Sequence, residues 1–189
     1  MNHRYLQKFQ IKDVVFLAIM SAVALATCAV MPLVISLQPL IFGISQLVTA
    51  LQIGVFFAIG LYKVRKPGSL LIMALMMGLI QLMMSPPMFL SSVLNGILIE
   101  RIVLLLFRGY EKDAAVFCAA ILHTPLSLPF NYLYNRLIKG ADSPLAAVAD
   151  RAPLAAVGMT LAVVAVSALG ALIGIKIARE LKKSGVLKK

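Results

Sequence analysis

The chain has 189 residues, of which 61% are hydrophobic and only 13% are charged, and its mean hydropathy is +0.98. Soluble globular domains are closer to half apolar and a quarter charged, so this composition excludes an ordinary soluble domain and indicates a membrane protein with several spans. The net charge of +11 would also suit a nucleic-acid-binding protein. That class is excluded because the basic residues lie at the ends of apolar runs and no nucleic-acid-binding motif is present.

Six apolar segments follow one another along the chain, separated by charged residues, proline or glycine. We expect helices at about residues 14–36, 40–62, 69–85, 88–107, 114–134 and 153–177. Each is close to the roughly 20 residues that cross a bilayer, and none shows the alternation of a strand. The sequence therefore predicts an all-α integral membrane protein, a six-transmembrane-helix bundle that forms a single membrane domain over residues 1–189.

The distribution of lysine and arginine between the connections predicts the orientation of this bundle. Placing the N-terminus inside leaves only three basic residues outside, namely Arg136, Lys139 and Arg151. It puts fourteen on the inner side: Arg4, Lys8, Lys12, Lys63, Arg65, Lys66, Arg108, Lys112, Lys176, Arg179, Lys182, Lys183, Lys188 and Lys189. The positive-inside rule then places both termini in the cytoplasm. The long outer connection, residues 135–152, is either a lid or a solvated loop.

The sequence lacks the usual signatures of catalysis and metal binding. There is no phosphate-binding loop, no HExxH or GxSxG motif and no pair of carboxylates at a workable spacing. The two cysteines, Cys28 and Cys118, lie within apolar segments and read as small hydrophobic residues. We therefore expect no catalytic residues, no metal site and no cofactor bound by this chain.

Polar side chains within the predicted spans are the candidate substrate-binding residues. Counting about 1.5 Å per helical residue places most of them between the middle of the membrane and its outer surface. Apolar walls with a few polar groups are typical of a small-molecule pocket, here open to the outside. The candidates are Gln46, Gln81, Asn95, Glu100, His123, Asn131, Tyr132 and Asn135.

Several candidates also have a purely structural interpretation. The two glutamines can form interhelical hydrogen bonds, and Tyr132 suits the interfacial belt. His123 can satisfy a carbonyl that Pro125 frees. Glu100, expected near the midplane, is a functional hypothesis by default, with a structural ion pair as the alternative. Its neighbour Arg101 projects about 100° away on a helix and is expected to serve a different surface.

Small residues spaced by four lie on the first predicted helix, at Ala18, Ala22 and Ala26. Such a stripe lets another helix approach closely, either from a partner protein or from within the bundle. Gly170 and Gly174 have the same spacing on the last helix, where we expect packing within the bundle.

Size, six predicted helices, cytoplasmic termini and the stretch AIMSA at residues 18–22 together resemble the S components of energy-coupling factor (ECF) vitamin transporters. The resemblance covers nearly the whole chain. It implies a subunit without its own ATPase that binds a vitamin or related small molecule in a bacterial or archaeal plasma membrane. It also implies docking of Ala18, Ala22 and Ala26 on a transmembrane coupling subunit, which works with two ATP-hydrolysing subunits.

Within that family the chain is most similar to S components for thiamine or its hydroxymethylpyrimidine precursor. RKPGSLL at 65–71 and NGILIE at 95–100 carry this likeness, the second resembling a Q-G-x-x-x-E stretch whose glutamate corresponds to Glu100. Asn95 replaces the glutamine of that stretch, and Gln81 stands where the subfamily has a glutamate. The missing carboxylate weakens the case for a cationic ligand.

Two other functions remain open at the level of sequence. One is a small integral membrane enzyme that uses Glu100 and His123, which would have to converge within hydrogen-bonding reach. The other is an autonomous proton-coupled carrier, for which an intramembrane carboxylate is suitable but no pair of inverted halves is evident.

Overall fold

The computed structural model describes residues 8–28, 30, 33–34, 36–83, 85–140 and 143–186. Within these ranges the chain is all helical, as predicted, with seven helices and no strand. The helices are α1 (Ile11–Thr27), α3 (Ile44–Val64), α4 (Ser69–Leu82), α5 (Pro86–Phe107), α6 (Asp113–Ile138), α7 (Pro144–Arg151) and α8 (Pro153–Lys183).

Proline and glycine mark where these helices begin. Pro86, Pro144 and Pro153 occupy the first positions of α5, α7 and α8, where the missing amide hydrogen costs nothing. Gly43 and Gly68 precede α3 and α4 with φ of 76° and 91°, a left-handed conformation that favours glycine. These residues therefore set the boundaries from which the site is built.

Two predicted boundaries differ from the structure. The first helix was expected over 14–36, but α1 ends at Thr27, and part of the remaining stretch lies outside the described residues. Pro32 within that stretch lacks the amide hydrogen that a continuous helix needs. The predicted connection 135–152 is not simply a loop, since α6 extends to Ile138 and α7 follows. Ala146 and Ala149 on α7 are buried, which gives this short helix a packed face.

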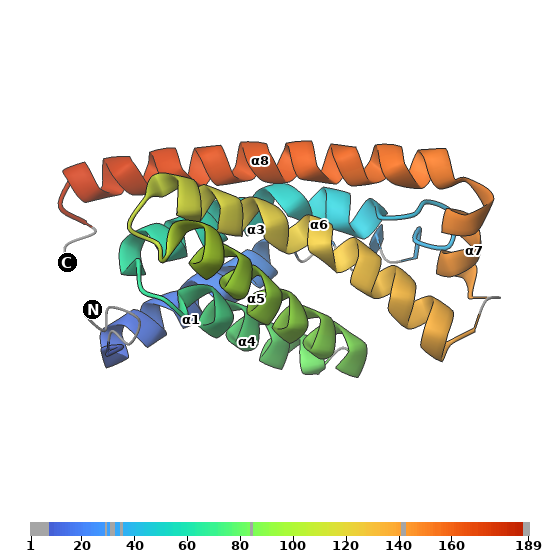
Figure 1. Ribbon diagram of the computed structural model, residues 1–189, viewed down its shortest axis with the longest axis horizontal. Coiled ribbons are helices and arrows are strands. Elements are labelled where there is room, and N and C mark those ends of the chain that lie inside the picture. Colours follow the sequence, from blue (N-terminus) through green and yellow to red (C-terminus); the bar gives the residue numbers. More distant parts are fainter. Residues whose placement is uncertain are drawn as a thin grey trace.

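The helices form an elongated bundle in which α8 lies along one side for the whole length of the molecule (Figure 1). α8 packs on α3 and α6, α4 packs on α5, and α1 lies against α3 and α4. The described ends of the chain lie together at one end of the bundle, and α7 lies at the other (Figure 1). The two ends of the molecule are therefore built from different segments, and the candidate site lies toward the α7 end.

Glycines bring α3 and α8 into direct backbone contact. A Cβ atom added to Gly170 would lie 2.4 Å from the carbonyl oxygen of Leu51, and one on Gly174 would lie 2.5 Å from that of Val55. Both distances are too short for any side chain. Gly170 and Gly174 thus serve packing within the bundle, as expected from the sequence.

Four of the described helices, α3, α5, α6 and α8, are long and apolar enough to cross a membrane, whereas α4 is apolar but shorter. Large hydrophobic side chains also cover the outside of the bundle, for example Leu105, Leu161 and Leu172, which are 83%, 65% and 55% exposed. Exposed apolar surface on this scale suits a lipid environment rather than water. The helices are therefore those of a multi-pass membrane protein.

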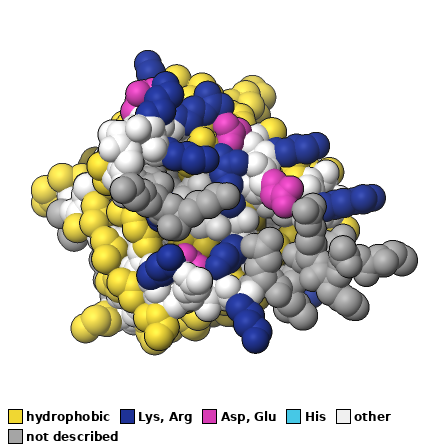
Figure 2. Space-filling view, turned by 90° about the vertical axis from the view of Figure 1, so that its left-hand side faces the viewer, with side chains coloured by type: hydrophobic (Ala, Val, Ile, Leu, Met, Phe, Trp, Pro, Cys, Tyr) yellow, Lys and Arg dark blue, Asp and Glu magenta, His cyan; other side chains and the backbone are white. Residues whose placement is uncertain are grey.

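The end of the bundle that holds the chain termini carries most of the basic residues (Figure 2). A charge network joins helices there: Asp113 pairs with Arg65 and with Arg179, the latter at 2.6 Å. Lys66 pairs with Asp13 at 2.6 Å and so ties the α3–α4 connection to α1. Lysine and arginine side chains outnumber carboxylates among the described side chains seen on this face (Figure 2).

Candidate functional site

A cavity of about 390 Å³ lies at the opposite end from the basic face. Its walls come from the first half of α3, the end of α4, the first half of α5 and the second half of α6, and the residues that open α7 border it. Pockets for small molecules start at about 300 Å³, so this volume suits a small-molecule ligand. The lining residues are Gln38, Pro39, Ser45, Gln46, Ile53, Met77, Gln81, Ser85, Pro87, Met88, Ser91, Ser92, Asn95, His123, Thr124, Ser127, Asn131, Tyr134, Asn135, Lys139, Ser143, Pro144 and Leu145.

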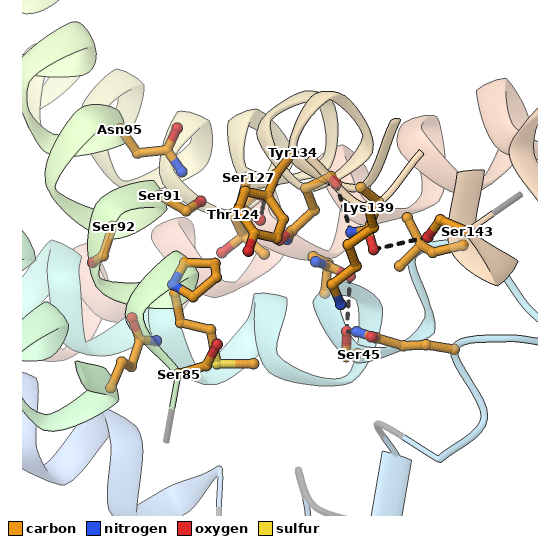
Figure 3. A pocket seen from close by; sticks show the side chains of 18 of the residues that line it. Ser45, Ser85, Ser91, Ser92, Asn95, Thr124, Ser127, Tyr134, Lys139 and Ser143 are labelled. Atoms are coloured by element: carbon orange, nitrogen blue, oxygen red, sulfur yellow. Dashed lines mark hydrogen bonds between the residues drawn. The ribbon is translucent and has the colours of Figure 1, made fainter. Parts of the chain in front are cut away.

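Helical periodicity explains why α6 contributes so many of these side chains. Thr124, Ser127, Asn131 and Asn135 are spaced by three or four residues and so share one face of the helix. On α5, Ser91 and Asn95 repeat the spacing of four. Figure 3 shows the labelled side chains extending from Asn95 on one side of the cavity to Lys139 and Ser143 on the other. The cavity thus has a deep end at Asn95 and a mouth near α7.

The deep end holds polar atoms that no described residue satisfies. Asn95, His123 and Thr124 are 1%, 5% and 3% exposed. The Oδ1 atom of Asn95, both ring nitrogens of His123 and the Oγ1 atom of Thr124 have no hydrogen-bond partner within the described residues. A buried polar group without a partner costs about 1–3 kcal/mol. These three side chains are therefore the candidates for hydrogen bonds to a molecule in the cavity.

Other lining side chains are already engaged within the protein. The Ser45 hydroxyl donates to Oε1 of Gln46 at 2.9 Å, and that of Ser92 donates to the Ala74 carbonyl at 3.0 Å. Near the mouth, the Ser143 hydroxyl donates to Oδ1 of Asn135 at 3.0 Å. Bonds of this kind fix the shape of the walls, and so a ligand finds a preformed cavity.

Six of the eight candidate residues from the sequence line this cavity, namely Gln46, Gln81, Asn95, His123, Asn131 and Asn135. Their convergence from four helices agrees with the expected pocket. The interpretation of His123 as a partner for a carbonyl freed by Pro125 is not seen, since neither ring nitrogen has a partner among the described residues. Sequence reasoning missed Ser91, Thr124 and Ser127, although helical spacing from Asn95 and Asn131 points to them.

Glu100 lies outside the cavity. Its carboxylate accepts hydrogen bonds from the backbone amide of Gly68 at 2.7 Å and from the Tyr110 hydroxyl at 3.0 Å. Gly68 is the N-cap of α4, so Glu100 satisfies the start of that helix and bonds the α3–α4 connection instead of the cavity. Burial, together with the neighbouring carboxylate, raises the pKa of Tyr110, which therefore stays a neutral donor. Arg101 is exposed and, as expected, serves another surface.

The pairing that an enzyme built on Glu100 and His123 would need is not formed. Glu100 bonds the α3–α4 connection, whereas His123 lines the cavity and contacts the Phe57 ring at 4.4 Å between centroids. No hydrogen bond joins the two side chains in the described part of the chain. The described residues also contain no group of three or more His, Cys, Asp or Glu that could hold a metal ion.

Tyr132 also lies outside the cavity lining, in a cluster that joins α6 to α7. Its hydroxyl donates to Asp150 at 2.7 Å, and Arg136 pairs with the same carboxylate at 3.0 Å. We call these three residues the α6–α7 clasp. Because Pro144 and Leu145 of the same segment line the cavity, the clasp holds the segment that forms the mouth.

The small-residue stripe of α1 faces outward. Ala22 and Ala26 are exposed, Ala18 is half-buried, and Val15 and Ile19 beside them are 49% and 51% exposed. Packing within the bundle therefore does not account for this stripe, which leaves a smooth apolar face where another helix can approach.

Comparison with known proteins finds one matching family and a solved structure of similar fold. The model of a family described as "hypothetical bacterial integral membrane protein (Trep_Strep)" matches residues 11–183. A solved structure described as the crystal structure of an S-component of ECF transporter superposes with a TM-score of 0.64 and 21% sequence identity, covering 95% of this chain and 89% of that chain. No curated protein matches the sequence.

The structural similarity extends over nearly the whole chain and so concerns the fold as a unit, with its helices around an internal cavity. The family match covers almost every described residue. The chain therefore has the fold of an S component and belongs to the Trep_Strep family of bacterial integral membrane proteins.

Proposed function

We propose that this protein is the substrate-binding subunit of an ECF-type importer and captures a vitamin or related small molecule from outside the cell. The observation that carries the proposal is the polar cavity at the end of the bundle away from the basic face. Its buried residues Asn95, His123 and Thr124 carry polar atoms that have no hydrogen-bond partner among the described residues. The likeness to an S-component supports the same function. Thiamine and hydroxymethylpyrimidine are the first ligands to test, because of the sequence resemblance.

The proposed topology has six transmembrane spans, with both termini in the cytoplasm of the cell and the cavity facing outward in the plasma membrane. In this proposal the two further spans are α1 and α4, which lie alongside the longer helices (Figure 1). The excess of lysine and arginine at the end that holds the described termini supports this orientation (Figure 2).

Energy for uptake comes from partner subunits in this proposal. The chain binds no cofactor itself, and a coupling subunit with two ATPase subunits hydrolyses ATP. The exposed face of α1 around Ala22 and Ala26 is the proposed docking surface, because small side chains let the backbone of a partner helix come close.

Two measurements on the same variants test this function. Small molecules extracted from the purified protein are identified by mass spectrometry, and uptake of the identified compound is then followed in cells. Asn95→Leu should abolish both binding and uptake, since it removes a polar group at the deep end. Ala22→Trp should abolish uptake and leave binding intact, because it blocks docking far from the cavity.

Leu161→Trp is the matched control, since Leu161 is 65% exposed on α8, away from α1. It should leave both uptake and binding unchanged. If Ala22→Trp takes up the compound as fast as the control, the proposed docking role of α1 is refuted. The proposed function is refuted if purified wild-type protein retains no small molecule whose binding depends on Asn95.

A further inference from the structure

We propose that the cavity discriminates ligands by charge: it takes an uncharged hydrogen-bonding group at its deep end and a negatively charged group, a carboxylate or phosphate, at its mouth beside Lys139. This inference rests on the proposed function and specifies the class of substrate that the subunit captures. Molecules with a fixed positive charge, such as thiamine, fall outside that class.

The first line of evidence is the set of charges around the cavity. Among the described lining residues, Lys139 is charged and none is a carboxylate. A cation entering this space would lose its water without gaining a counter-charge, which is strongly unfavourable. Gln81 lines the cavity as an uncharged amide, so the wall of α4 offers a hydrogen bond and no negative charge. The walls are thus built for a ligand that brings no positive charge.

The second line of evidence is the chemistry of the deep end. The unpartnered Oδ1 atom of Asn95 is an acceptor, the Thr124 hydroxyl can donate or accept, and a neutral imidazole at His123 offers one donor and one acceptor. All three side chains are almost completely buried. Such a mixed set complements an uncharged group with its own donors and acceptors, for example an amide or an aminopyrimidine ring.

The third line of evidence is the position of Lys139. It follows α6 as its C-cap residue and lies near Tyr134, with its Nζ atom 6.0 Å from the ring centre. Figure 3 places Lys139 across the cavity from Asn95. No carboxylate of the described residues forms an ion pair with it. The other cation of this end of α6, Arg136, is paired with Asp150. Among the described residues that line the cavity, Lys139 is therefore the basic side chain with which an anionic group in the mouth would pair.

The test compares the compound retained by wild-type protein with that retained by Lys139→Ala, Lys139→Arg and Arg151→Ala, all purified as the full chain. Arg151 is an exposed cation of the same end that does not line the cavity, so its loss controls for the general field of positive charge. The retained compound is identified by mass spectrometry, and its affinity is measured by equilibrium binding.

We expect a compound that carries a carboxylate or phosphate and no fixed positive charge. Its affinity should fall about twofold to fivefold in Lys139→Ala, the range for an ion pair at a solvent-accessible mouth. Lys139→Arg should restore it, and Arg151→Ala should leave it unchanged. Hydroxymethylpyrimidine, its phosphate ester and thiamine share one ring and differ in the charge of the attached group, and thiamine should be the weakest of the three.

A retained compound with a fixed positive charge would overturn the inference and leave the proposed function standing. Equal affinity in wild type and Lys139→Ala, or an equal loss in Arg151→Ala, would also overturn it. Absence of any retained compound would refute the proposed function, and the inference with it.

Discussion

Replacing Glu100 should destabilise the protein without weakening its ligand affinity. Glu100→Ala removes the acceptor for the Gly68 amide at 2.7 Å and for the Tyr110 hydroxyl at 3.0 Å. Tyr110 is completely buried, so its hydroxyl would be left without a partner. A hydrogen bond to a charged group contributes about 1.5–3 kcal/mol, so the loss of both bonds should lower the free energy of unfolding by about 3–6 kcal/mol.

A double-mutant cycle of Glu100→Ala with Tyr110→Phe measures how much of this free energy comes from the Glu100–Tyr110 hydrogen bond. Tyr110→Phe removes the donor and leaves no orphaned hydroxyl, so it should cost less than Glu100→Ala. The double variant should be less destabilised than the sum of the two, because the hydrogen bond can be lost only once. Thermal unfolding in detergent gives the stability of each variant, and binding of the co-purified compound gives its affinity. Loss of affinity in Glu100→Ala at unchanged stability would show that the carboxylate contacts the ligand and that our placement of it is incorrect.

Two further predictions concern packing and the mouth. Gly170→Ala should lower the unfolding free energy by about 1–3 kcal/mol, since its Cβ would meet the Leu51 carbonyl at 2.4 Å. Gly158→Ala on the same helix meets nothing within 4 Å and should be neutral or slightly stabilising in the same unfolding assay; equal losses would refute the packing argument. Asp150→Asn should speed ligand release, seen by stopped flow, because it weakens the α6–α7 clasp through Arg136. Unchanged release would show that the clasp does not hold the mouth closed.

The sequence predicts most of the cavity because depth along a helix can be counted. Helical rise predicts Asn95 between the midplane and the outer surface, His123 near the middle of the membrane and Asn131 at the outer end of its helix, and all three line the cavity. Each lies on a long helix with clear boundaries, so errors of one or two residues do not move it out of the site. The helical spacing that relates Ser91, Thr124 and Ser127 to Asn95 and Asn131 is a weak signal, because serine and threonine are small and common in membrane helices.

Glu100 shows where counting fails. Counting residues from the outer end of its own helix gives the depth of Glu100 along that helix. It does not show which other segments of the chain pack against the side chain. In the structure the α3–α4 connection reaches the side chain from the basic end, and the Gly68 amide meets it there. A contact between residues 32 positions apart depends on how α4 and α5 pair, which periodicity does not reveal. The early end of α1 at Thr27 likewise depends on the chain beyond it.

The contact of Gly170 and Gly174 with α3 has a consequence for how a solute can enter. Their backbones touch the carbonyls of Leu51 and Val55, so sliding α8 along α3 would bring larger side chains into a space that admits none. We therefore expect α3 and α8 to stay fixed relative to each other as one rigid unit. Since α3 carries one wall of the cavity, under the proposed function we expect entry and exit to depend on movement of the opposite walls and of α7, and not on sliding of α8 along α3.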